Sequence, residues 1–218
     1  MLYLDNRPLN PSRRTAANGP DRFYQWRGFF DDNSELDDIV QVVEKEFSEQ
    51  ETTDHTDKYF LLPGRSNTIT TLCDNETLEV HTMISANGPI EHWERSVKTT
   101  FPMKRTTASI IGTYVPKFRG SCSSVADAAS LTDALSKKSR YYEANLKRRR
   151  FERNGVSAEL ETVTIEGKTK ISIALRGENP TALTREVEAL GLKGTENTHF
   201  GAYLNCLLYT SPSPRDRG

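Results

Sequence analysis

Two dipeptides, Asn154-Gly155 and Glu166-Gly167, constrain the fold more than any other feature of the sequence. Asparagine and glycine both tolerate a positive φ angle, so the first dipeptide is a strong signal for a two-residue turn between antiparallel strands. The second is a further candidate turn. Around these turns, the segment from Arg140 to Arg176 carries apolar residues at every second position: Phe151, Ala158, Leu160, Ile171, Ile173 and Leu175. This two-residue period predicts a three-stranded antiparallel sheet with one face in a core.

The opposite face of the predicted sheet is charged. A tight turn at Asn154-Gly155 places Arg150 opposite Glu159 and Arg148 opposite Glu161. Cross-strand pairs of opposite charge on a solvated surface would each contribute slightly to stability. The same arrangement inside a closed sheet would instead form the wall of a charged channel. The residues alone leave both interpretations open.

The charge balance argues against nucleic acid and against an anionic membrane as partners. The chain of 218 residues has 29 Lys and Arg against 30 Asp and Glu, so it has no global basic field. The basic run from Lys147 to Arg150 is divided between two faces by strand alternation, which makes it a poor continuous patch for RNA. No apolar run approaches the length of a membrane span. The three cysteines lack metal-ligand spacing, so we expect a cytoplasmic, reduced protein of undetermined oligomeric state.

The two ends of the chain differ in composition from its body. Residues 1–20 mix Pro, Asn, Arg and Gly without periodicity, which predicts a disordered leader. Residues 206–218, CLLYTSPSPRDRG, resemble the translation of a transposon-type sequencing-library adapter. That interpretation has the natural chain end near Asn205, and the alternative is a Ser/Pro-rich disordered tail. We therefore expect a single domain over residues 21–205.

Hairpin-joined strands with interspersed helices predict an α+β domain with an antiparallel sheet. The aromatic-rich segment 22–30 is typical of a strand, with Gln25 and Arg27 on one face. Apolar residues at helical spacing between Leu36 and Phe47 predict a helix that packs on the sheet. Further strands are expected at 58–62, 67–73, 77–84 and through Trp93, and further helices at 106–114, 125–137 and 180–190.

Several segments, taken in order, resemble the CYTH-like (triphosphate tunnel metalloenzyme) superfamily, and most closely an uncharacterised bacterial-type branch of it. They run from residue 22 to residue 200 and read FYQWRGF, NETLEVH, IEHWERSVKTTFP, KRRRFERNGVSAELETVTIEG, ISIALRGENPTALTREVEALGL and NTHF. The resemblance implies an antiparallel β barrel or half-open tunnel with flanking helices. In such proteins basic residues inside the tunnel hold a polyphosphate, and glutamates bind a divalent metal.

The resemblance assigns roles to particular side chains. Glu159 and Glu161 would hold Mg²⁺ or Mn²⁺, and a water activated by the metal would attack the terminal phosphorus of a phosphorylated small molecule. Arg27, Arg148 and Arg150 would hold phosphate, because guanidinium groups match phosphate oxygens. The remaining candidates for the same tunnel are Gln25, Glu79, His81 and Lys98.

The sequence also departs from the family pattern. The first strand of family enzymes carries alternating acidic residues followed by lysine, whereas residues 22–30 contain no carboxylate. Ile69 and Thr71 occupy positions of inward-pointing cations, and Glu79 and His81 lie where a lysine is expected. Two alternatives follow: a metal-dependent phosphohydrolase of the triphosphatase type, or a non-catalytic module that binds a ligand or a protein and has lost the metal site.

Overall fold

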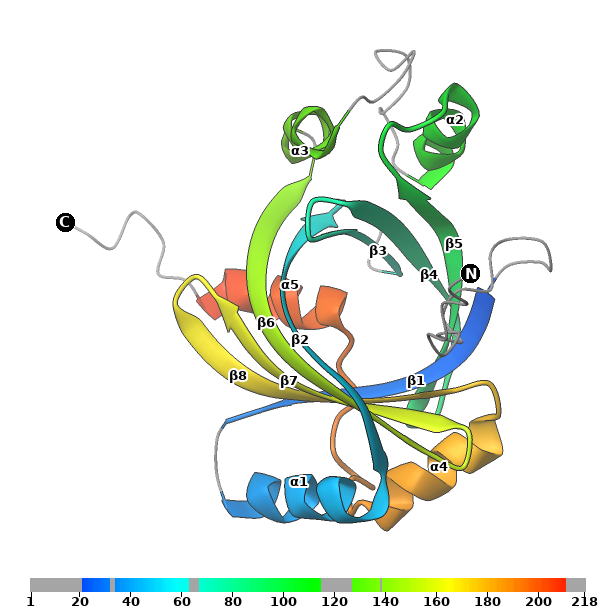
Figure 1. Ribbon diagram of the computed structural model, residues 1–218, viewed down its shortest axis with the longest axis vertical. Helices are drawn as coiled ribbons and strands as arrows, with labels where there is room; N and C mark the ends of the chain where they lie inside the picture. Colours follow the sequence, from blue (N-terminus) through cyan, green and yellow to red (C-terminus); the bar gives the residue numbers. More distant parts are fainter. Residues whose placement is uncertain (1–20, 32–33, 63–66, 115–126, 138, 211–218) are drawn as a thin grey trace, which may run out of the picture.

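A computed structural model of the protein contains eight antiparallel strands that close into a barrel (Figure 1). The structure describes residues 21–31, 34–62, 67–114, 127–137 and 139–210, so the predicted leader and the end of the predicted tail lie outside the described residues. The strands are β1 (Asp21–Phe30), β2 (Ser48–Leu61), β3 (Thr68–Cys73), β4 (Thr77–Asn87), β5 (Ile90–Thr100), β6 (Arg140–Arg153), β7 (Val156–Ile165) and β8 (Lys168–Gly177).

The barrel is closed rather than half-open. Its strands neighbour one another in the order β1-β5-β4-β3-β2-β6-β7-β8, and β8 pairs with β1 to complete the circle. Closure divides side chains into an inner and an outer set that alternate along each strand. The predicted α+β class and antiparallel barrel are therefore confirmed.

The register predicted for the charged hairpin is also confirmed. Arg148 pairs with Glu161 and Arg150 with Glu159 across β6 and β7. Asn154 and Gly155 have φ angles of 53° and 75°, as a tight turn of this kind requires. The second turn has the same form, with φ angles of 50° at Glu166 and 75° at Gly167. Both turns are encoded locally, which explains why the sequence predicts this part of the barrel well.

Among the described residues, four helices pack on the outside of the barrel in two pairs (Figure 1). Helices α1 (Ser34–Glu46) and α4 (Pro180–Ala189) pack on a core that includes Trp26, Phe151 and Leu175. Helices α2 (Arg105–Tyr114) and α3 (Ala128–Ser136) pack at the opposite end of the molecule on a second core. In both cores the strands supply their outward-facing apolar residues. No described helix is both long and apolar enough to cross a membrane.

A fifth helix, α5 (Phe200–Thr210), packs on inward-facing residues of the barrel. The ring of Phe200 stacks on Tyr59 with centroids 4.6 Å apart, and Tyr203 stacks on Phe29 at 3.9 Å. This helix was not predicted from the sequence, and it continues past residue 205 to Thr210. Its aromatic rings therefore fill part of the barrel interior.

Residues just before α5 attach it to β1. The backbone N–H of Arg27 donates to Asn197 Oδ1 at 2.9 Å, and the backbone N–H of Thr198 donates to the Arg27 carbonyl at 2.7 Å. Beyond Gln25, β1 no longer pairs with β5, and this connection supplies the missing hydrogen bonds. The barrel is thus completed at this point by the C-terminal part of the chain.

Candidate functional site

A cluster of buried charges occupies the inner wall formed by β1, β6, β7 and β8. Arg27 of β1 is 2% exposed, and its guanidinium group contacts Glu161 and donates to Ser172 Oγ at 2.7 Å. The same guanidinium lies 3.4 Å from Glu159. Arg148 donates to the other carboxylate oxygen of Glu161 at 2.6 Å. Strand alternation places all of these side chains on the inner face, so the predicted residues Arg27, Arg148, Glu159 and Glu161 come together.

A further arginine completes the cluster. Arg176 of β8 lies 3.6 Å from Glu159 and donates through Nε to Gln25 Oε1 at 2.9 Å. Gln25 is therefore part of the same wall as Arg27, and the sequence had placed these two residues on one face of the strand. Arg150 lies one step farther along β6, and its guanidinium is 3.9 Å from Glu51 of β2. Its register partner Glu159 instead contacts Arg27 and Arg176.

The arginines keep both buried glutamates ionised. Burial would raise the pKa of Glu161, but the charges and hydrogen bonds of Arg27 and Arg148 outweigh it and hold that pKa well below its ordinary value. The pKa of Glu159 is lowered in the same way, against burial, by Arg176, Arg148 and Arg27. A carboxylate this well paired is a poor proton acceptor near neutral pH. Neither glutamate is therefore suited to act as a general base.

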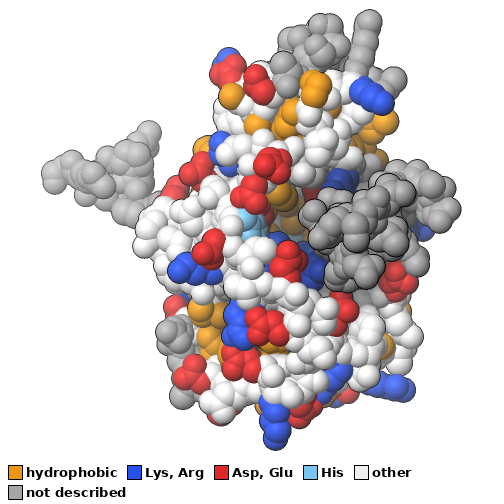
Figure 2. Space-filling model, viewed as in Figure 1, with side chains coloured by type: hydrophobic (Ala, Val, Ile, Leu, Met, Phe, Trp, Pro, Cys, Tyr) orange, Lys and Arg blue, Asp and Glu red, His pale blue; other side chains and the backbone are white. Residues whose placement is uncertain are grey.

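Two neighbouring cavities lie along this wall. The first, of about 120 Å³, is lined by Gln25, Arg27, Arg148 and Arg176, with Phe200 of α5 among its remaining lining residues. The second, of about 230 Å³, is lined by Glu51, His55, Arg148 and Arg150 among others. Arg148, Asp57 and Cys73 line both, so the two cavities adjoin. The space-filling view shows acidic and basic side chains interspersed over this face of the molecule (Figure 2).

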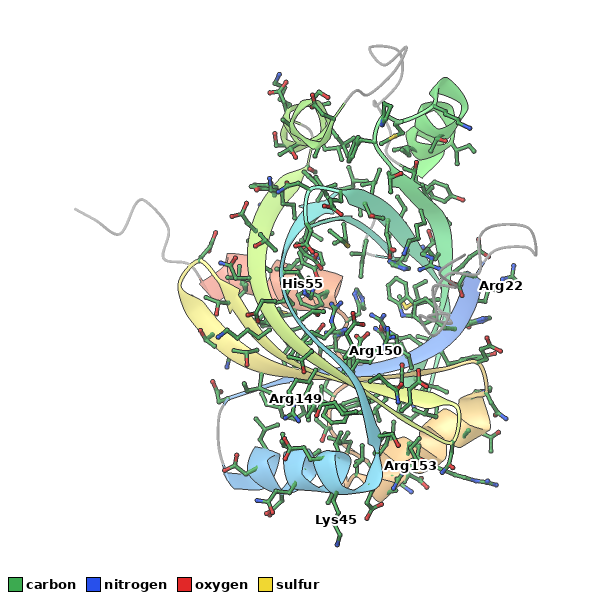
Figure 3. The ribbon with its side chains drawn as sticks, viewed as in Figure 1. Arg22, Lys45, His55, Arg149, Arg150 and Arg153 are labelled. Carbon is green, nitrogen blue, oxygen red and sulfur yellow. The ribbon has the colours of Figure 1, made fainter. Side chains whose placement is uncertain are left out.

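The two faces of the β6 basic run are clearly separated. Figure 3 shows His55 and Arg150 within the ring of strands, whereas Arg149 and Arg153 lie toward α1. Arg149 pairs with Glu44 and Glu49 on the outside of the barrel. Only the even-numbered arginines of the run, Arg148 and Arg150, therefore face the cavities, as the alternation predicted.

The other three candidates form a second charged group on β4 and β5. Glu79 forms an ion pair with Lys98, with 2.7 Å between Oε1 and Nζ, and its Oε2 lies 3.5 Å from His81 Nε2. Arg95 approaches the same carboxylate at 3.6 Å. Burial lowers the pKa of His81 to about 4, so the imidazole is neutral at physiological pH. Glu79 and His81 line the first cavity, opposite the arginine wall.

The donor atoms do not fit a divalent metal at Glu159 and Glu161. Mg²⁺ and Mn²⁺ take several oxygen ligands, commonly from more than one carboxylate together with water. Here the two carboxylates are occupied by Arg27, Arg148 and Arg176, and neither glutamate lines the two cavities described above. Within the described part of the chain, no group of three or more His, Cys, Asp or Glu side chains is arranged to hold a metal ion.

Several residues of these cavities were not predicted from the sequence. Asp57 and His55 lie in the part of β2 that precedes residue 58, because the strand begins at Ser48 rather than near residue 58 as predicted. That part is rich in polar residues and lacks the apolar alternation that marks a strand. Arg176 was within the predicted hairpin but was not assigned to the site. Cys73, one of the cysteines that lack metal-ligand spacing, lines both cavities, and burial raises the pKa of its thiol.

Comparisons with known proteins give matches among solved structures alone, because no protein-family model and no curated protein sequence matches the chain. A conserved hypothetical protein from Pyrococcus furiosus is 14% identical with a TM-score of 0.51, and the match covers 80% of this chain and 94% of that one. A protein from Pyrococcus horikoshii is 17% identical, with coverages of 79% and 93% and a TM-score of 0.48. A candidate adenylyl cyclase from Hippeastrum, reported to have a dominant triphosphatase activity, is 10% identical, with coverages of 88% and 98% and a TM-score of 0.49.

The structure defines a closed barrel protein, with eight antiparallel strands and paired charges on the inner wall. The likeness to the Pyrococcus furiosus protein is a likeness of fold, and the closed antiparallel barrel agrees with the architecture that the sequence resemblance implied. At these sequence identities the likeness establishes the fold, and the activity has to be argued from the side chains.

Proposed function

We propose that the tunnel binds a phosphorylated small molecule carrying a polyphosphate, and that it does so as a non-catalytic binding module. The observation that carries this proposal is the row of three arginines at the cavity surfaces. Arg148 lines both cavities, Arg176 the first and Arg150 the second. Guanidinium groups offer several donors in a fixed plane that matches phosphate oxygens, so a row of them suits a chain of phosphates.

The weak pairing of Arg176 supports an anionic ligand. On the arginine wall, Arg27, Arg148 and Arg176 face three carboxylates, those of Asp57, Glu159 and Glu161. On the opposite wall, Lys98 and Arg95 pair with Glu79, and Arg95 also pairs with Asp21. Arg176 is held loosely within this arrangement, by a neutral amide and by a carboxylate 3.6 Å away, which leaves donors for a ligand.

The same contacts argue for binding rather than for hydrolysis. Hydrolysis of a phosphoanhydride requires an activated water, which a divalent metal commonly provides. The two glutamates are occupied by arginines, and their lowered pKa values make them weak bases. We therefore favour the non-catalytic module over the metal-dependent phosphohydrolase, the other function that the sequence resemblance implied.

Calorimetric titration with tripolyphosphate tests the proposal. The wild-type protein should bind, and Arg148→Gln should weaken binding by about tenfold or more, because a hydrogen bond to a charged group contributes ~1.5–3 kcal/mol. The matched control is Arg149→Gln, which removes the same group from the next residue of β6 on the outer face. It should leave the dissociation constant unchanged.

Two outcomes would contradict the proposal. The first is the absence of tripolyphosphate binding by the wild-type protein, and the second is an equal loss of affinity in Arg148→Gln and Arg149→Gln. Phosphate release from tripolyphosphate and from nucleoside triphosphates, measured with Mg²⁺ or Mn²⁺, separates binding from hydrolysis. Release that is lost in Glu159→Gln/Glu161→Gln would restore the phosphohydrolase hypothesis.

A further inference from the structure

Asp57 is a buried carboxylate on the boundary between the two cavities. It lies on β2, is 3% exposed and lines both cavities beside Arg148. The register of β2 places it opposite Cys73 on β3 and Ala144 on β6. The charged and titratable groups that act on it come from four strands, β2, β3, β6 and β7: His55, Tyr59, Cys73, Arg148 and Glu161.

One oxygen of this carboxylate lacks a strong donor. Oδ2 accepts from the Tyr59 hydroxyl at 3.4 Å and lies 3.8 Å from His55 Nε2. Oδ1 is buried and has no oxygen or nitrogen donor among the described residues, and the Cys73 thiol, a weak donor, also hydrogen-bonds to this carboxylate. Buried polar atoms are almost always hydrogen-bonded, because an unpaired one costs the free energy of its lost hydration. The weakly paired Asp57 oxygen beside the second cavity therefore points to a ligand that supplies a donor.

We propose that the second cavity is a subsite for a terminal phosphate group, and that Asp57 Oδ1 accepts a hydrogen bond from the P–O–H of that phosphate. The guanidinium groups of Arg148 and Arg150 donate to its other oxygens. The cavity of about 230 Å³ is large enough for one phosphate group with water, since a water molecule takes about 30 Å³ of liquid. This inference rests on the proposed function. It adds which end of the ligand the protein recognises, namely the terminal phosphate.

The chemistry of Asp57 gives the subsite a selectivity. A terminal phosphate keeps an ionisable O–H into the neutral pH range, because its second pKa is about 6 or above. A phosphate therefore brings the proton that a buried carboxylate needs. Sulfate has the same shape and charge but no O–H at neutral pH, so its oxygen would face the Asp57 oxygen without a proton between them. Burial raises the pKa of Asp57, against His55, Arg148 and Cys73, which lower it, and this favours a shared proton.

Inorganic phosphate and sulfate provide a direct comparison. At pH 7 and matched ionic strength, we expect the wild-type protein to bind phosphate at least about tenfold more tightly than sulfate in calorimetric or thermal-shift titrations. Asp57→Asn replaces the acceptor by an amide that can donate to either anion. This variant should bind both within about threefold of each other, mainly through tighter binding of sulfate.

The matched control is Asp54→Asn, because Asp54 lies on the same strand, is exposed and faces outward opposite Lys147. It should keep the wild-type preference for phosphate. Equal binding of phosphate and sulfate by the wild-type protein would overturn the inference, and this test does not depend on any variant folding. Absence of phosphate binding would overturn it too. If tripolyphosphate still binds in either case, the proposed function stands, whereas loss of tripolyphosphate binding removes both.

Discussion

Arg27 is balanced by two carboxylates instead of by solvent, and this makes its partners important for stability. Arg27 is 2% exposed, and its guanidinium contacts Glu161 and Glu159. Its Cζ lies over the ring of Phe200, 4.9 Å from the ring centroid. Removal of one partner from a buried ion pair leaves an uncompensated charge. The stability of the barrel should therefore depend strongly on Glu161.

We predict that Glu161→Gln lowers the free energy of unfolding by about 3–5 kcal/mol, because Arg27 and Arg148 both lose the charge they share. Urea denaturation measures this change. Glu44→Gln, which removes one of the two partners of the outward-facing Arg149, should have little effect, because solvent screens exposed pairs. A loss under about 1 kcal/mol in Glu161→Gln would show that solvent reaches the cluster and that its pairing is weak.

Gly28 is required by close packing on the outer face of β1. A methyl group at this position would lie 2.8 Å from Trp26 Cη2 and 2.8 Å from two ring carbons of Phe30. We predict that Gly28→Ala destabilises the protein by about 1–3 kcal/mol, as overpacking of a core does. Gly112→Ala in α2 is the control, because nothing lies within 4 Å of the added methyl, and it should be neutral or stabilising by up to ~1 kcal/mol. Thermal unfolding of the two variants distinguishes these results.

At the scale of the element, α5 has a pH-sensitive attachment. The helix begins after His199, whose Nδ1 accepts from the Ala202 backbone N–H at 3.2 Å. Burial, aided by the charge of Arg27, lowers the pKa of His199 to about 4. The native state thus holds a neutral imidazole at His199. In the unfolded chain the same imidazole takes up a proton near its ordinary pKa of about 6.5. The stabilisation is full above pH 6.5 and is lost as the pH falls toward 4.

We predict that His199→Asn reduces the pH dependence of unfolding between pH 6.5 and 4 by about 2–3 kcal/mol. Asparagine can accept a hydrogen bond at a helix start but does not titrate, so the variant keeps the attachment and loses its protonation. Urea denaturation over this pH range measures the difference between wild type and variant. His81, whose pKa is also about 4, contributes equally to both and cancels in the comparison. Parallel pH profiles would contradict the assignment.

The elements also show what the sequence could predict. The hairpins of β6, β7 and β8 were predicted in their correct register because their turns and their alternation are local signals. The part of β2 before residue 58 and the whole of α5 were missed because their partners are distant in sequence. The polar residues before Asp57 become a strand by pairing with β6, about 90 residues later. Helix α5 packs on inward-facing residues of the barrel, and no sequence period signals that environment.

For the whole molecule, closure of the barrel decides what its charges can do. The predicted face of arginine and glutamate was open to two interpretations, and the closed topology turns it inward. The sequence identified Arg27, Arg148, Glu159 and Glu161, which lie together. It assigned the glutamates to a metal, whereas the structure places three arginines on their oxygens. Which groups contact Glu159 and Glu161 depends on side chains from four strands. The sequence of one hairpin does not contain that information.

This arrangement makes the proposed binding independent of divalent cations. The charge that a metal would supply to a polyphosphate is already present on Arg148, Arg150 and Arg176, and Glu159 and Glu161 are neutralised by arginine. We predict that the affinity for tripolyphosphate in the presence of EDTA equals or exceeds that in Mg²⁺, because Mg²⁺ competes with the protein for phosphate oxygens. Calorimetric titrations under the two conditions test this. Binding that requires Mg²⁺ or Mn²⁺ and is lost in Glu159→Gln would instead make the glutamates metal ligands, with the arginines displaced when the ligand enters.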